Sequence, residues 1–185
     1  MASWYEICLR LSFFSLIHII QLMNRAFQGV SPGTPDSLEA WSTFGGSQIA
    51  VIADPAPVSS ALPNTLQVTV PSSAAAFTGF TNDGYWGMKI ERGKAYKASF
   101  YAKLNSTSVG PIKVSLVSST GTTLASASVP ALTTSWKQYT LSLVPSIATS
   151  NSNNTFSISF GSSQAKGKAV NFAMFSLFPP TFKGR

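Results

Sequence analysis

The chain has 185 residues, of which 44% are hydrophobic and 12% aromatic, so it can bury the core of one ordinary domain. Only 10% of the residues are charged. Ser, Thr, Asn and Gly supply most of the polarity, which is typical of secreted β-proteins and unlike a disordered chain. The net charge is +7, but the basic residues are scattered singly, so nucleic acid is not an expected partner. The charge favours a general attraction to anionic polysaccharides such as pectin.

Residues 1–23 contain the most apolar stretch of the chain. As a membrane helix this stretch is short and is interrupted by Arg10, His18 and Gln21, so we do not expect it to span a membrane. As a signal peptide it has an apolar centre but lacks a typical cleavage site. A helix or strand that packs on another domain is the third interpretation. We favour a signal-like or altered start.

Cys8 and His18 are the single cysteine and the single histidine. They exclude a disulfide within the chain, the common zinc sites and a Ser-His-Asp triad in the body of the protein. A structural Ca²⁺ would need oxygen ligands, and no loop is rich enough in acids to predict one. We therefore expect no metal and no other cofactor.

Composition divides the rest of the chain into a linker, a body and an exit segment. Residues 24–40 form the linker, which is rich in turn residues; residues 41–178 form the body; and residues 179–185, which begin with two prolines, lead out of it. The body has no helical stripe and consists of short strands separated by turns. The predicted strands are 48–53, 65–70, 77–80, 86–90, 96–104, 112–118, 123–129, 137–144, 155–160 and 169–178.

Several predicted strands alternate between apolar and polar residues with a period of two. In 96–104, for example, Tyr96 and Phe100 share one face, whereas Lys97 and Lys103 share the other. One buried and one solvated face are typical of antiparallel sheets. The pattern predicts an all-β fold, an antiparallel β-sandwich of the jelly-roll kind, preceded by an apolar segment that does not conform to it. A closed barrel is the alternative.

The acidic residues suggest no catalytic centre. A glycosidase needs two carboxylates flanking the scissile bond, roughly 5–10 Å apart. The six acids fall in no recognisable motif, and Asp54 and Asp83 both have ordinary explanations as turn residues. No catalytic residue is predicted, and we expect no turnover by this chain alone.

Aromatic side chains are the remaining candidates for a binding site, because flat rings match the apolar faces of sugars. Tyr85 and Trp86 follow a turn, and Tyr101 lies on the charged face of its strand. We predict these three as sugar-binding residues, with Asn82 as a polar partner. Trp136 opens an alternating strand and is predicted to lie in the core.

Two sequons, at Asn105 and Asn153, are candidate glycosylation sites and mildly favour secretion.

Six short stretches of the sequence carry a resemblance to a known family, in which they occur in the same order. They are NRAFQG (24–29), SSALPN (59–64), GFTNDGYWG (79–87), SFY (99–101), NNTF (153–156) and SLFPPTFK (176–183). From residue 24 onward the chain resembles the N-terminal part of the fungal type of α-L-arabinofuranosidase, glycoside hydrolase family 51. Residues 18–23, HIIQLM, depart from the acidic lead usual in that family.

The resemblance implies a galactose-binding-like, carbohydrate-binding module. In the family a (β/α)₈ barrel with two catalytic glutamates follows, and that barrel is not in this chain. The first hypothesis is therefore a non-catalytic module for arabinose-bearing hemicellulose or pectin, such as arabinoxylan and arabinan, secreted together with a catalytic domain. The alternatives are a structural domain that only braces the barrel and an enzyme that itself releases arabinose.

Overall fold

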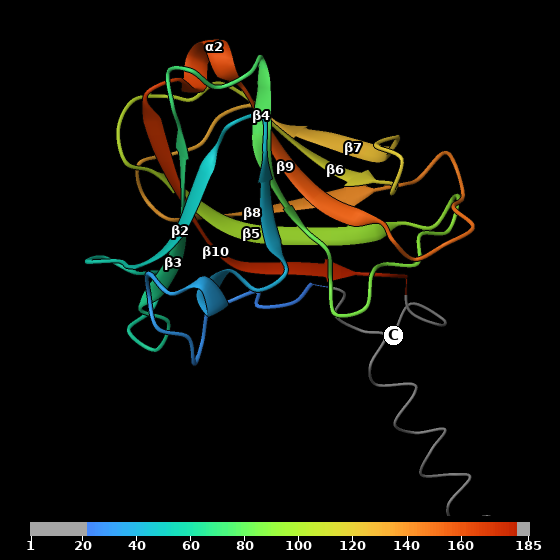
Figure 1. The fold of residues 1–185 in the computed structure, drawn as a ribbon, viewed down its shortest axis with the longest axis horizontal. Coiled ribbons are helices and arrows are strands. Elements are labelled where there is room, and N and C mark those ends of the chain that lie inside the picture. Colours follow the sequence, from blue (N-terminus) through green and yellow to red (C-terminus); the bar gives the residue numbers. More distant parts are fainter. Residues whose placement is uncertain (1–21, 181–185) are drawn as a thin grey trace, which may run out of the picture.

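The computed structural model describes residues 22–180 as two antiparallel sheets of five strands each, packed face to face (Figure 1). Sheet A has the order β1 (Trp41–Phe44), β4 (Phe77–Asn82), β9 (Thr155–Gly161), β6 (Ile112–Val117) and β7 (Thr123–Val129). Sheet B has the order β2 (Gln48–Ala53), β3 (Asn64–Val70), β10 (Lys168–Phe178), β5 (Tyr96–Leu104) and β8 (Lys137–Leu143). The short helices η1 (Pro35–Leu38) and α2 (Ser162–Ala165) complete the described elements. The predicted sandwich is confirmed, and the separate sheets exclude the barrel.

The apolar positions of the alternating strands meet between the sheets. Leu66 and Val68 of β3, in sheet B, and Phe156 and Ile158 of β9, in sheet A, are all fully buried in this core. The polar positions of the same strands form the two outer faces. Alternation in the sequence therefore identified the core of these strands correctly.

A cluster of aromatic rings fills the centre of the core. Trp41 and Phe175 lie with their ring centroids 4.6 Å apart, and Phe175 also contacts Phe27, Phe80 and Phe100. Ring pairs at such separations stabilise a core beyond the area that they bury. The cluster joins both sheets to the segment that precedes them.

A β-bulge in β10 brings Phe175 into this cluster. Ala173 pairs with Tyr101 and Ser176 pairs with Ser99, so β10 has one more residue than β5 between these pairs. Met174 carries the strain, with a φ of 51°. Without the extra residue Phe175 would point outward, because side chains in a strand alternate between faces.

Two details of the strand prediction are wrong. Residues 86–90 form no strand, because Gly84 and Gly87 adopt φ values of 73° and 79° and the backbone N–H of Met88 bonds to the Ser152 carbonyl of a neighbouring loop. The strand Trp41–Phe44 was not predicted. It is short and lies at the edge of sheet A, where it pairs with β4 alone among the strands of residues 22–180.

Residues 22–40 lie against the sandwich. Leu22 and Phe27 are buried in its core, and the Trp41 indole donates a hydrogen bond to the Asn24 carbonyl over 3.2 Å. The Phe175 amide donates to the Arg25 carbonyl over 3.0 Å. The division of the chain into linker, body and exit segment stays a prediction, and residues 1–21 and 181–185 lie outside the described part.

We expect Gly79→Ala to destabilise the fold by about 1–3 kcal/mol, because a Cβ there would overlap the Ile158 carbonyl and lie 2.9 Å from the Phe44 ring. Gly161→Ala is the matched control, since its Cβ would meet open space. Urea unfolding of both variants measures the difference. Equal stability of Gly79→Ala and the wild type would contradict this account.

Candidate functional site

The outer face of sheet A carries a shallow groove of about 490 Å³. Six hydroxyl side chains from β4, β6, β7 and β9 line it, and Ser115 and Ser157 are its most buried ones. The aromatic rings of Phe44 and Phe77 also line it, and Phe77 is 75% exposed. The full lining is Phe44, Phe77, Thr81, Lys113, Ser115, Val117, Gly121, Thr123, Thr155, Ser157 and Ser159.

Strand register explains the shape of this groove. Gly79 faces outward between Phe44 of β1 and Ser159 of β9, and its missing side chain makes room for the Phe44 ring. The neighbouring strands β9, β6 and β7 carry short Ser and Thr side chains on this face, so the surface is hollowed in the middle of the sheet. The result combines an apolar ring surface with many small donors and acceptors, which is the usual make-up of a small-molecule or sugar site.

Tyr85 and Trp86 form a second exposed feature, in the loop after β4. They are 58% and 79% exposed, and their ring centroids lie 6.3 Å apart. The Asn154 side chain, which donates to the Met88 carbonyl over 2.7 Å, holds this loop to the β8–β9 connection. Tyr85 also lines a pocket of about 250 Å³ formed with residues 22 and 24–28. Hydrogen bonding therefore holds the loop that carries Tyr85 and Trp86 in place.

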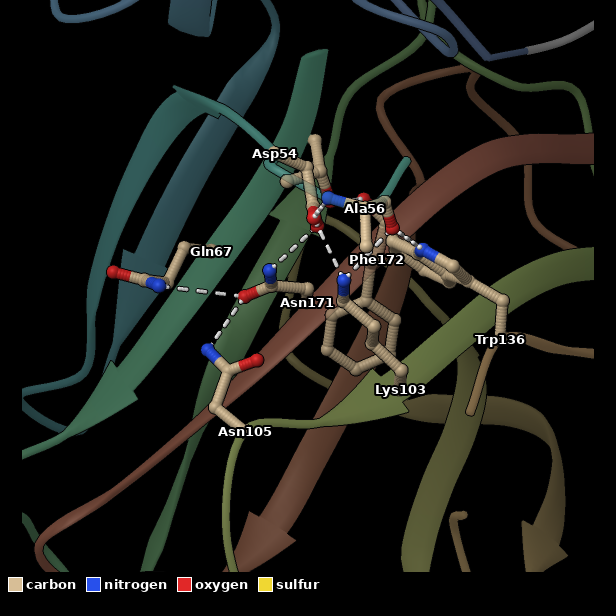
Figure 2. A network of polar contacts seen from close by, with 9 residues as sticks. Asp54, Ala56, Gln67, Lys103, Asn105, Trp136, Asn171 and Phe172 are labelled. Atoms are coloured by element: carbon tan, nitrogen blue, oxygen red, sulfur yellow. Dashed lines mark hydrogen bonds and ion pairs between the residues drawn. The ribbon is translucent and has the colours of Figure 1, made fainter. Parts of the chain in front are cut away.

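A polar network covers part of the outer face of sheet B (Figure 2). The buried Asp54 carboxylate accepts hydrogen bonds from Lys103 over 2.7 Å and from Asn171 over 3.0 Å. The Asn171 carbonyl oxygen in turn accepts from Gln67 and Asn105. Both oxygens of Asp54 and both polar ends of Asn171 are thus occupied within the protein, which is typical of a structural network.

Trp136 closes this network from outside, so its predicted place in the core is wrong. Its indole N–H donates to the Ala56 carbonyl over 2.8 Å, and the Lys103 ammonium lies 4.9 Å from the ring centroid (Figure 2). The side chain is half-buried. It precedes the first residue of β8 and packs over the β2–β3 loop, which alternation along a single strand cannot indicate.

The other predicted site residues are not gathered in one place. Asn82 is fully buried, and its amide bonds to the backbone of Met23 and Gly84, which makes it a structural residue that a surface ligand does not reach. Tyr101 is half-buried on the outer face of sheet B, on the other side of the sandwich from the groove. Sequence reasoning missed the groove residues, whose only signal was the row of Ser and Thr on the polar faces of their strands.

Two further observations concern residues 22–180 alone. No helix among them is long and apolar enough to cross a membrane. Nor do three or more His, Cys, Asp or Glu side chains in this part gather into a group that could hold a metal ion.

Comparison with known proteins gives this fold a family. Residues 21–166 match the family described as a carbohydrate binding domain. The chain belongs to this family. Solved carbohydrate-binding modules share the fold of this carbohydrate-binding domain at low identity; a CBM22-1 xylan-binding domain from Paenibacillus barcinonensis is 15% identical, with a TM-score of 0.52 over 84% of this chain and 90% of that one.

Longer relatives confirm the resemblance to arabinofuranosidases. The carbohydrate-binding domain is 33% identical to alpha-L-arabinofuranosidase A of Aspergillus kawachii over 89% of this chain and 25% of that protein. The structure of the arabinose-bound MgGH51 α-L-arabinofuranosidase superimposes with a TM-score of 0.85 and 42% identity, over 91% of this chain and 27% of that one. The chain thus spans about a quarter of the length of these relatives.

The Asp54–Lys103 pair predicts how stability depends on pH. Burial alone would raise the pKa of Asp54, but the Lys103 ammonium and the hydrogen bonds from Ala56 and Asn171 outweigh it and hold the pKa below its usual 3.8. A lowered folded-state pKa adds stability above the unfolded-state pKa, and this part is lost as the pH falls through the folded-state pKa. We therefore expect the free energy of unfolding to decrease as the pH falls below about 4.

Asp54→Asn should lose about 1.5–3 kcal/mol at pH 7 and should show a flatter acid limb than the wild type, because it removes a charged hydrogen-bond acceptor. Guanidinium unfolding between pH 2.5 and 7 measures both effects. Asp83→Asn, at an exposed turn, is the matched control. The assignment is wrong if Asp54→Asn keeps the full pH dependence of the wild type.

Proposed function

We propose that this domain binds arabinose-bearing plant cell-wall polysaccharide, such as arabinoxylan or arabinan, through the groove on sheet A. The main support for this proposal is the groove itself, which is lined by two phenylalanine rings and six hydroxyl side chains. The names of the longer relatives motivate the sugar, since they are arabinofuranosidases. Bond cleavage is left to a catalytic domain of the kind those names indicate.

The chemistry of the groove supports a sugar chain as its ligand. Sugar rings present apolar C–H faces and a rim of hydroxyl groups, so they need both flat apolar surface and many small polar partners. Phe77 offers an exposed apolar ring, and covering this ring with a sugar removes apolar surface from water, which favours binding. Ser115 and Ser157 offer hydroxyls that both donate and accept hydrogen bonds, and the Ser159 hydroxyl, which donates to the Lys113 carbonyl over 3.5 Å, can accept one.

The Tyr85–Trp86 pair is the second candidate for the sugar-binding surface. Its support is the exposure of both rings on a loop that hydrogen bonds hold in place. The groove is favoured because it brings an exposed phenylalanine ring and six hydroxyl side chains together in one hollow, whereas the Trp86 ring does not line the pocket beside Tyr85. If neither surface binds sugar, the domain has the bracing role alone.

We expect Phe77→Ala to lower the affinity for arabinoxylan about tenfold, because partial burial of a phenylalanine by a ligand accounts for about 1.4 kcal/mol. Affinity electrophoresis and titration calorimetry measure the change. Ile147→Ala, which removes another exposed apolar side chain outside the groove, is the matched control. Because Phe77 is 75% exposed, we expect its loss to change the free energy of unfolding by no more than about 0.5 kcal/mol.

A Trp86→Ala variant distinguishes the two surfaces. Full binding by Trp86→Ala together with weak binding by Phe77→Ala supports the groove, and the reverse result assigns binding to the aromatic pair. Unretarded migration of the wild-type protein on both arabinoxylan and arabinan would refute the proposed function and leave the bracing role.

We further propose that the protein is secreted and carries glycans on Asn105 and Asn153. Both side chains are exposed, and Asn105 keeps one amide hydrogen for its bond to Asn171 when the other is replaced by a glycan. Expression through a yeast secretory pathway should give a protein that loses mass on endoglycosidase treatment. The Asn105→Gln and Asn153→Gln variants should each remove one step of that loss, and an unchanged mass would contradict the proposal.

A further inference from the structure

Lys113 is the one charged residue among those that line the groove on sheet A. It projects from β6 and is exposed. Within residues 22–180 the ion pair found joins Lys103 to Asp54, so Lys113 has no carboxylate partner in the described part of the chain. A neutral sugar can be bound by hydroxyl groups alone, so the ammonium group adds a capacity to bind a negatively charged group.

The register places Lys113 in line with the aromatic end of the groove. Gly79, Ser159 and Lys113 are direct neighbours on β4, β9 and β6, and the Phe44 ring lies beside Gly79. Neighbouring strands are about 4.8 Å apart, so roughly 10 Å separate the backbone under the ring from the backbone of Lys113. This span matches about two sugar units, and no bulky side chain stands between its ends.

We propose that the groove takes an acidic polysaccharide, in which a uronic acid unit places its carboxylate on the Lys113 ammonium while a neighbouring neutral sugar covers the phenylalanine rings. This inference rests on the function proposed above and adds the class of ligand. The groove lining contains no carboxylate that would repel such a ligand. The net charge of +7 adds a long-range attraction for anionic polymers.

The geometry also sets the expected size of the effect. Lys113 is solvent-exposed, so its pairing with a carboxylate is partly screened by water and salt. We expect a three- to tenfold gain in affinity from the uronic acid at low ionic strength, and a smaller gain at 0.5 M salt. A ligand held by general charge attraction alone would respond equally to any surface lysine.

The test compares arabinoxylan that carries glucuronic acid side groups with the same material after chemical reduction of its carboxyl groups. Wild-type protein should bind the acidic form three- to tenfold more tightly in titration calorimetry. Lys113→Met should lose most of this preference and keep only the small part that the overall positive charge of the protein supplies. Lys166→Met, which removes an exposed lysine from the turn before β10, is the matched control and should keep the wild-type preference.

Each other result overturns the inference. Equal wild-type affinity for the two forms refutes it while leaving the proposed function intact. An equal loss in Lys113→Met and Lys166→Met refutes it in favour of general charge attraction. An absence of binding to both forms refutes the proposed function and this inference together.

Discussion

The fold depends on burying one continuous aromatic cluster between two sheets. Phe175 is at its centre, where it contacts rings from sheet A, from sheet B and from the segment before β1. Its inward position requires the bulge at Met174, since regular alternation would turn it to the outer face. The cost of an unfavourable backbone conformation at Met174 is offset by burying a large ring. The cluster therefore fixes the packing of the two sheets against each other. Their outer faces take no part in this packing.

The two outer faces are chemically different. On sheet B, Asp54 and Lys103 are satisfied by one another and by amide side chains, so that face is closed by contacts within the protein. On sheet A, the hydroxyl side chains of the groove and the exposed Phe77 ring line a hollow that is open to solvent. A buried charge that loses its partner destabilises the fold, whereas a hydroxyl group that water reaches is well solvated. This difference is the reason why we place the proposed binding site on sheet A and treat the network on sheet B as structural.

The exposure and surroundings of single side chains could be predicted from the sequence where the cause is local. Tyr85 and Trp86 follow a glycine turn, and both are exposed. Asn82 and Trp136 were misplaced because their surroundings come from distant segments, the Met23 backbone for the first and the β2–β3 loop for the second. The resemblance in short motifs located the family, which the match over residues 21–166 and the arabinofuranosidase relatives confirm.

The sequence by itself determined the all-β class, the inward faces of the regular strands and the relatives to which the chain is similar. These follow from a period of two within single strands and from short motifs, both of which are local. Only the tertiary structure decided where the groove lies, since it is formed by residues of five strands in the order β1-β4-β9-β6-β7. Three of the four neighbouring pairs, β1-β4, β4-β9 and β9-β6, join strands that are far apart in the chain. The inward turn of Phe175 likewise depends on a pairing shift between β10 and β5. Long-range strand pairing sets both features, and no local pattern encodes it.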